Sequence, residues 1–138
     1  MPLQVQYLDQ GRGVVFTATG MLTGEEFVRT NAEILSRDLV AEPYLYGLFD
    51  FDGVEAVSVS ANDIREVASR NVAESVKMPK LVVAVHATSN LTYGLARMWE
   101  ILVEQSGWTT SVFRDRSEAV AWLKKEVELR FGVKIHLD

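Results

Sequence analysis

Histidine and aspartate are the residue types in this sequence from which catalysis or metal binding would start. His86 and His136 are the two histidines, and neither has the i, i+4 or Cys/His spacing of a metal site. His86 and Thr88 follow a long apolar run, and we expect both to lie beside Asp50 at one edge of a sheet. This cluster would bind a small ligand; the alternative is that His86 is a hydrogen-bonded core residue.

A catalytic role for the same residues lacks support in the sequence. Ser89, His86 and Asp50 can be arranged as a triad on paper, but the sequence has no Gly-x-Ser-x-Gly segment to expose a nucleophilic serine. Gly11 and Gly13 precede a strand and not a helix, so they cannot cradle a pyrophosphate in the Rossmann manner. We therefore expect no enzymatic activity and no cofactor.

Charged residues offer two further candidate sites. Asp50 and Asp52 could share a divalent metal ion, but Asp-x-Asp-Gly also favours a tight bend, and we expect no metal. Arg114 and Arg116 follow the last predicted strand beside a helix start, where an anion would bind. The alternative is that both arginines pair with the neighbouring carboxylates at positions 115 and 118.

Composition limits the class of protein. The chain has 138 residues, 48% of them hydrophobic, which suits one domain, residues 1–138, with a single core. Its net charge of −5 argues against nucleic-acid and acidic-membrane partners, which attract basic surfaces. No apolar run approaches the roughly 20 residues that span a bilayer. Residues 1–7 lack the features of a signal peptide, and cysteine is absent, so we expect a cytoplasmic protein.

The N-terminal part of the sequence predicts a hairpin followed by a helix. Two strand-like runs, 5–8 and 14–19, are joined by a glycine-containing link, and Gly20 should end the second run. Thr23 and Glu26 have the spacing of a capping box, in which side chains bind free amides at a helix start. A first helix should therefore begin at this point.

The central part of the sequence predicts a buried strand, an acidic turn and a second helix. The apolar run from Tyr44 should end at Asp50, because strands buried on both faces lack polar alternation. Ser60 then suits the N-cap of the second helix, with Asp63 three residues later. We expect an inward face made of Ile64, Val67, Ala68, Asn71, Val72 and Val76.

The C-terminal half continues the alternation of strands and helices. The clearest buried strand is 81–87, and a third helix, a last parallel strand and a fourth helix should follow at 91–105, at 108–113 and from residue 117. The tail, 133–137, alternates in polarity, which fits either a short edge strand or a packed terminus.

The third predicted helix is apolar around much of its circumference. One explanation is that it is wedged between the sheet and its neighbours. The other is that a surplus apolar face containing Tyr93 and Trp99 forms a homodimer contact, since large exposed apolar patches mark interfaces.

The order is therefore β-β-α-β-α-β-α-β-α, an α/β fold with a mostly parallel mixed sheet covered by helices and an antiparallel first strand at one edge. This order is similar to that of flavodoxin-like receivers and of STAS domains. The receiver resemblance requires an acidic pair after the first parallel strand and a lysine after a later one. The corresponding strand ends Thr17-Ala18-Thr19-Gly20, and Arg114 stands where lysine is required, which favours the STAS class.

Residues 50–61 resemble, without a gap, the Asp-Leu-Ser-Gly-Val-x-x-Ile-Asp-Ser-Ser-Gly segment of STAS domains, which include bacterial anti-sigma factor antagonists. In members regulated by kinases, a serine at this helix start accepts phosphate, and the added charge controls partner binding. Ser60 stands at one family serine, Val59 replaces the other, and Ser58 replaces the family aspartate. The resemblance implies a partner-binding or switch surface that contains Asp50, Asp52, Ser58, Ser60 and Asn62.

Three later segments, 93–100, 112–115 and 118–123, resemble a narrower group of small bacterial proteins with SpoIIAA-like folds. Phe-Arg-Asp followed by an Ala-x-x-Trp-Leu helix carries this resemblance. It implies a fold and no established chemistry. Related folds bind a protein partner in most cases, and sometimes a nucleotide or an apolar ligand.

We therefore expect a cytoplasmic, homodimeric SpoIIAA/STAS-like protein that acts as a non-enzymatic regulatory or protein-interaction module. Its partner surface would extend from Asp50 to Asn62 and along the second helix. The alternative is a protein that binds a small apolar ligand or a nucleotide. That site would use the third helix with candidate residues His86, Thr88, Tyr93, Arg97, Trp99 and Arg114, and a well-formed pocket bounded by Tyr93, Met98 and Trp99 would favour it.

Overall fold

The computed structural model describes residues 3–138; Met1 and Pro2, the start of the N-terminal segment considered above, lie outside the described residues. The elements are β1 (Leu3–Leu8), β2 (Gly13–Thr23), α1 (Gly24–Ile34), β3 (Tyr46–Ser58), α2 (Ala61–Glu74), the 3-10 helix η1 (Ser75–Lys77), β4 (Val82–His86), α3 (Asn90–Leu102), the 3-10 helix η2 (Glu104–Ser106), β5 (Thr109–Phe113) and α4 (Arg116–Phe131). The predicted order of strands and helices is confirmed.

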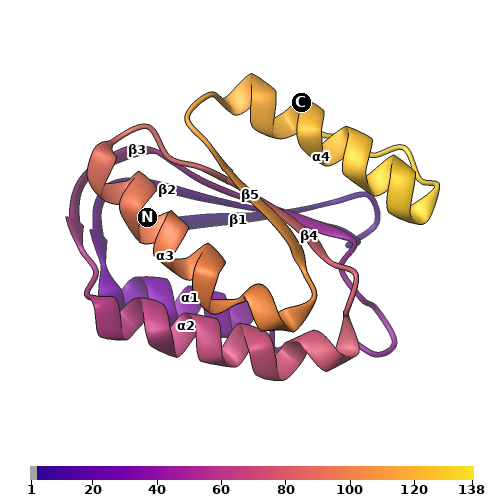
Figure 1. Cartoon of the computed structure of the whole chain (residues 1–138), viewed down its shortest axis with the longest axis horizontal. Coiled ribbons are helices and arrows are strands. Elements are labelled where there is room, and N and C mark those ends of the chain that lie inside the picture. The colour runs from indigo at the N-terminus through magenta and orange to yellow at the C-terminus, as the bar shows by residue number, and fades with distance from the viewer. Residues whose placement is uncertain (1–2) are drawn as a thin grey trace.

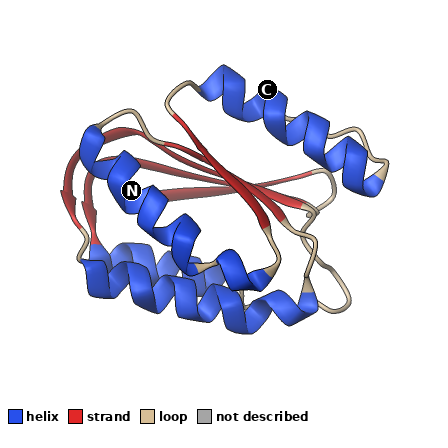
Figure 2. Cartoon of the chain, in the orientation of Figure 1, coloured by secondary structure: helices blue, strands red, loops and turns tan. Residues whose placement is uncertain are grey.

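The strands form one mixed sheet (Figure 2), in which their order is β1-β2-β3-β4-β5. β1 pairs with β2 in the antiparallel direction, and the remaining neighbours are parallel, as the sequence predicts. All five residues of β4 are buried, which explains its continuous apolar sequence.

The sheet separates two cores (Figure 1). α1, α2 and α3 cover one face, and α4 covers the other. Alternation along β4 shows the division, because Val83 and Val85 point into the three-helix core while Val82 and Ala84 point toward α4. The C-terminal tail completes the α4 core through buried Ile135, so it is a packed terminus and not an edge strand.

β2 and β3 are much longer than predicted. β3 pairs with β4 only as far as Asp50, but β2 and β3 remain paired to Thr23 and Ser58 and curve away together toward the helices (Figure 1). We call this extension, residues 19–23 of β2 and 51–58 of β3, the ribbon. The predicted strand end at Gly20 and the predicted acidic turn after Asp50 are therefore both wrong.

Two β-bulges explain why turn-like residues lie inside these strands. Thr17 and Thr19 pair with Asp50 and Gly53, so β3 contains an extra residue there, and a second register shift follows Gly20. The Asp52 amide donates to Asp50 Oδ1 at 3.0 Å, which is the local hydrogen bond that an Asx turn would use. The acidic segment therefore bends the strand without ending it.

The predicted helix starts are confirmed by their capping contacts. Thr23 Oγ1 accepts from the Glu26 amide, and Ser60 forms a complete capping box with Asp63. One predicted inward residue is placed wrongly: α2 ends at Glu74 and η1 follows, so Val76 is 79% exposed.

A buried polar contact fixes the three helices of one layer relative to one another. Asn71 Nδ2 of α2 donates to Asn31 Oδ1 of α1 at 3.1 Å, and Trp99 Nε1 of α3 donates to Asn71 Oδ1 at 2.8 Å. All three side chains are buried, so each hydrogen bond satisfies groups that water does not reach.

Among the helices that the structure describes within residues 3–138, none has the length and apolar character needed to cross a bilayer.

Candidate functional site

The polar cluster predicted at the carboxyl edge of the sheet is present and is centred on Asp50. The parallel register pairs Asp50 of β3 with His86 of β4. His86 Nδ1 lies 2.9 Å from Asp50 Oδ1, and Arg116 Nε donates to Asp50 Oδ2 at 3.3 Å. The side chains of His86 and Asp50 are only 5% and 13% exposed. His86 is thus a hydrogen-bonded core residue, and Asp50 is not part of an open partner surface.

Thr88 and Arg114 belong to an adjoining set of contacts at the start of α3. Thr88 is exposed and donates its hydroxyl to Asp52 Oδ1 at 3.0 Å. Arg114 Nη1 donates to the Thr88 carbonyl oxygen and to Asn90 Oδ1, both at 3.1 Å. Its guanidinium carbon lies 4.2 Å from the centre of the Tyr93 ring, a cation–π contact.

The structure corrects the partners predicted for the two arginines. Arg114 binds the loop before α3, and Arg116 pairs with Asp50, so the predicted pairing with carboxylates at 115 and 118 is wrong. Arg116 also donates to the main-chain oxygen of Asp138. The cluster therefore joins β3, β4, α4 and the C-terminal tail, and its groups satisfy one another. Within residues 3–138, no group of three or more potential metal-ligating side chains is gathered around one point.

The remaining candidate residues of α3 do not join this cluster. Arg97 is exposed and pairs with Glu100 on the same helix. Trp99 is 4% exposed and bonded to Asn71, so it lies in the core and not on a surplus apolar face. The buried position of Trp99 excludes it from the expected homodimer contact, whereas Tyr93 is half-buried under Arg114.

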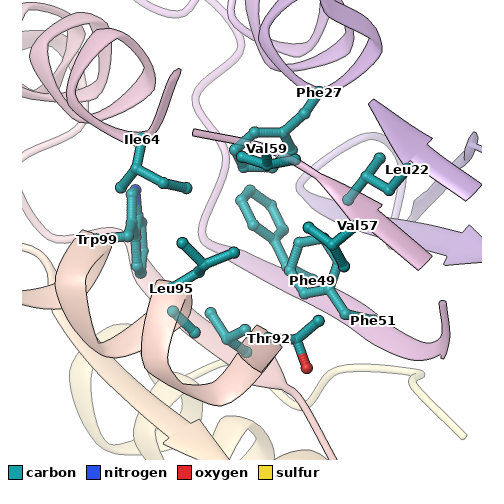
Figure 3. Close-up of a pocket in the computed structure, with 12 residues that line it drawn as sticks. Leu22, Phe27, Phe49, Phe51, Val57, Val59, Ile64, Thr92, Leu95 and Trp99 are labelled. Atoms are coloured by element: carbon teal, nitrogen blue, oxygen red, sulfur yellow. The ribbon is translucent and has the colours of Figure 1, made fainter. Parts of the chain in front are cut away.

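An apolar pocket lies between the ribbon and α3 (Figure 3). Its cavity volume is about 40 Å³, and about 470 Å³ when the open space at its mouth is included. Apart from Thr92, its lining is entirely apolar. The lining residues are Leu22, Phe27, Phe49, Phe51, Val57, Val59, Ile64, Val85, Thr92, Leu95, Ala96 and Trp99.

The walls of the pocket are set by aromatic packing. The ring of Phe16, at the centre of this core, lies 5.3 Å from Phe49 and 5.8 Å from Phe51. Phe51 also contacts Phe27 at 6.0 Å, and Phe49 contacts Trp99 at 6.2 Å. Such tilted and edge-on pairs are favourable, so they stabilise the packing at the floor of the pocket. Tyr93 and Met98, which were expected to bound a pocket, are not among its lining residues.

Of the residues expected to bound a pocket on the third helix, only Trp99 lines this one, and sequence reasoning missed the wall formed by β3 although a signal for it exists. Phe49 and Phe51, and then Val57 and Val59, are pairs of apolar residues two positions apart that line the pocket, with a polar residue between the members of each pair. That alternation is typical of a half-buried strand. The sequence nevertheless predicts a turn here, because the Asp-x-Asp-Gly motif has the local propensity of a tight bend.

The proposed switch residues lie at the far end of the ribbon. Ser58 and Ser60 are both exposed. The Ser60 hydroxyl accepts from the Asp63 amide at 3.1 Å, and Asp63 Oδ2 accepts from the Ser60 amide at 2.8 Å. Asn62 is exposed and accepts from Arg65. Ser60 is therefore an N-cap whose hydroxyl lies at the protein surface.

A second buried charge lies at the opposite edge of the sheet, in the β1–β2 turn. Asp9 accepts from the Tyr46 hydroxyl at 2.6 Å and from the His136 amide at 3.1 Å, and His136 Nδ1 lies 2.7 Å from Asp9 Oδ1. Burial raises the pKa of Asp9, but the hydrogen bonds from Tyr46 and His136 outweigh it, so the pKa lies below its ordinary value. Burial and the Asp9 carboxylate also raise the pKa of Tyr46. Asp9 thus anchors the C-terminal tail.

The fold of this chain is similar to that of a known protein structure, although its sequence has no match. The sequence matches no protein-family model and no curated protein sequence. The structure is similar to the crystal structure of an uncharacterised protein of the DUF3478 family, with a SpoIIAA-like fold, from Shewanella loihica PV-4. The TM-score is 0.56 at 17% sequence identity, and the similarity covers 88% of this chain and 91% of that one. This chain therefore has a SpoIIAA-like fold.

Proposed function

We propose that this protein is a non-enzymatic, regulatory protein-interaction module whose partner binds at the ribbon and the start of α2. The observation that carries the proposal is the open apolar pocket beside the ribbon. Anti-sigma factor antagonists, which the sequence resembles at residues 50–61, act by binding protein partners, and the SpoIIAA-like fold supports the same kind of role.

The surface of the ribbon supports this role. Asp52, Gly53, Glu55, Ala56 and Ser58 are all exposed along β3. Phe51 and Val57 of the same strand line the pocket, so an apolar group of a partner could be buried there while its polar backbone contacts the ribbon. Interfaces commonly combine an apolar centre with a polar rim of this kind.

The contacts within the polar cluster argue for a structural role of these residues and against their use as catalytic groups. Asp50 accepts from Arg116 and lies against His86, and Thr88 is bonded to Asp52. A general base must reach the proton that it abstracts, and here the imidazole is buried and the carboxylate is already paired. We therefore assign these residues to stabilising the carboxyl edge of the sheet.

A small apolar ligand is the second candidate, because the pocket lining includes a single polar residue, Thr92. Pockets for small ligands usually exceed roughly 300 Å³ and contain a few polar anchors. The cavity volume of about 40 Å³ is far smaller, so a ligand of drug size would have to widen the pocket. This comparison favours a side chain from a protein partner.

Site-specific photocrosslinking in the native host tests the proposal. A crosslinking amino acid replaces Ala56, which is exposed on the ribbon, and in a matched control it replaces Ala121, which is exposed on α4. We expect a protein adduct at position 56 that is absent at position 121. Equal adducts at both positions, or none at 56, would contradict the proposed surface.

Native mass spectrometry of the host-purified protein separates the alternatives. Retained small-molecule mass that is lost when Leu95→Trp fills the pocket would support the ligand-binding function instead. Phosphate mass that is lost in Ser60→Ala would add a phosphorylation switch at the N-cap of α2. The same spectrum gives the subunit number and so tests the expected homodimer.

A further inference from the structure

The ribbon leaves one strand edge without a neighbour. β3 pairs with β2 through Ser58, but its other edge pairs with β4 only from Tyr46 to Asp50. Across the described part of the chain, residues 3–138, the backbone of Gly53 to Ser58 makes hydrogen-bonded pairs with β2 and with no other element. Residues 53–58 therefore present an open edge on the side from which β4 has ended, beyond Asp52, whose amide is bonded to Asp50 and whose side chain is bonded to Thr88.

An open edge of this kind is a template for strand addition. Unpaired amides and carbonyls bind extended chains, and proteins limit unwanted pairing with bulges and charged side chains. β3 has both protections, with two bulges and the exposed carboxylates of Asp52 and Glu55. Alternate residues point their backbone groups to the same edge, so this stretch offers about three or four residues for pairing. Such an edge is suited to a specific and short partner strand.

The pocket adjoins the same edge. Phe51 and Val57 of β3 lie on one side of it, and Thr92 and Leu95 of α3 lie on the other (Figure 3). In strand addition, main-chain hydrogen bonds supply affinity and side-chain pockets supply specificity. A strand lying along β3 would point alternate side chains toward α3, where one apolar side chain could enter the pocket.

The charged residues of the ribbon indicate which side chains of the added strand should flank its apolar residue. Asp52 and Glu55 are exposed at the edge, and the whole chain has a net charge of −5. Arg114 keeps its positive charge, but its Nη1 is held at the loop before α3 by two hydrogen bonds, whereas Glu55 lies further along the ribbon. Basic side chains would therefore find complementary charge along the ribbon, and acidic ones would be repelled.

We propose that residues 53–58 of β3 bind an extended segment of a protein partner as an added strand, with one apolar side chain in the pocket and basic residues beside it. The proposal rests on the proposed function, because it specifies how the partner contacts the ribbon. It assigns the recognition of the partner to the backbone of β3 and to the space between Val57 and Leu95.

The test starts from a random peptide library displayed against the full chain. The tightest peptide is synthesised, together with a form that carries N-methyl groups on alternate backbone amides and a form with its apolar residue replaced by alanine. We expect selected peptides to have an apolar residue between lysine or arginine residues. We expect N-methylation and the alanine replacement each to weaken binding at least about tenfold. Binding should slow hydrogen exchange at residues 53–58.

Variants of the protein test the charge contribution. Glu55→Lys should weaken the selected peptide about tenfold, whereas Glu118→Lys, at an exposed position on α4, should leave its affinity within about twofold. Circular dichroism of both variants confirms that each is folded. Equal effects of the two substitutions would contradict the role of the ribbon.

The outcomes separate this inference from the proposed function. If the library yields no peptide, or if N-methylation leaves affinity unchanged, strand addition is wrong. A protein crosslinked at Ala56 under those conditions would show a partner bound through side chains, and the proposed function would remain. If no protein is crosslinked at Ala56 either, both are wrong.

Discussion

Asn71 is the residue whose loss should disturb this fold most specifically. Its side-chain amide donates to Asn31 Oδ1 and accepts from Trp99 Nε1, at 3.1 and 2.8 Å, so one side chain joins α1, α2 and α3. Asn71→Ala removes both hydrogen bonds and leaves a buried carbonyl oxygen on Asn31 and a buried indole N–H on Trp99.

The expected cost follows from these two groups. Leaving one buried donor or acceptor without a partner costs about 1–3 kcal/mol, and removing the buried amide of Asn71 returns part of that. We therefore expect Asn71→Ala to lower the free energy of unfolding by about 2–4 kcal/mol. This is a large share of the roughly 5–15 kcal/mol that stabilises a typical domain.

Urea unfolding monitored by circular dichroism measures the loss. With a denaturant slope of about 2 kcal/mol per M, in the middle of the usual range, the midpoint should fall by about 1–2 M. A double-mutant cycle with Trp99→Phe isolates the indole bond, because phenylalanine lacks the donor. The coupling between the two positions should be about 1 kcal/mol.

Asn62→Ala is the matched control, since Asn62 is exposed on the same helix and contacts only Arg65 through a side-chain hydrogen bond. Asn62→Ala should change the free energy of unfolding by no more than about 0.5 kcal/mol. If Asn71→Ala is as mild as Asn62→Ala, or if its cost is unchanged in the Trp99→Phe background, the reasoning about unsatisfied buried groups is refuted.

Three further predictions concern backbone space, capping and pH. Gly13→Ala should lower the free energy of unfolding by about 2 kcal/mol or more in urea titrations, because its Cβ would lie 2.1 Å from the fully buried Tyr46 ring. Gly94 lies in α3 with open space around it, so Gly94→Ala should instead raise the free energy of unfolding by about 0.5–1 kcal/mol. A lower free energy of unfolding for Gly94→Ala would contradict the statement that this position has open space. Ser60→Ala should reduce the thermal unfolding midpoint through a loss of about 1 kcal/mol of capping, whereas Ser58→Ala should be nearly neutral; equal midpoints would argue against the cap. Because the folded-state pKa of Asp9 is lowered, its carboxylate stabilises the fold above the unfolded value near 3.8, and that contribution is lost as pH falls through the folded value. Asp9→Asn should therefore flatten the fall of stability as the pH drops below the unfolded value near 3.8, and an unchanged acid limb would count against this account.

The proposed strand addition also affects how the pocket is interpreted. By itself, the pocket has a cavity volume that is too small to hold a sizeable ligand. Beside an open strand edge, it has the size and place to receive one side chain of an added strand. The two features come from the same physical cause, because β4 ends at His86 while β2 and β3 continue.

The sequence predicted the order of elements and their local boundaries where short-range chemistry decides them. Caps at Thr23 and Ser60 were predictable because an N-cap depends on residues three positions apart. The buried strand β4 was predictable because both of its faces are covered, which removes polar alternation. The meeting of Asp50 and His86 was predictable because parallel strands end at one edge of a sheet.

Tertiary structure decided the rest. Asp50, Asp52 and Gly53 have the same local chemistry in a turn and in a bulge, and only pairing with β2 selects the bulge. Arg116 had several carboxylates within reach of its sequence position, and the packing of α4 selected Asp50. The pocket depends on how closely α3 approaches the ribbon. Hydrophobic patterns specify which faces are buried, but a gap between two buried faces is set by packing across the whole core.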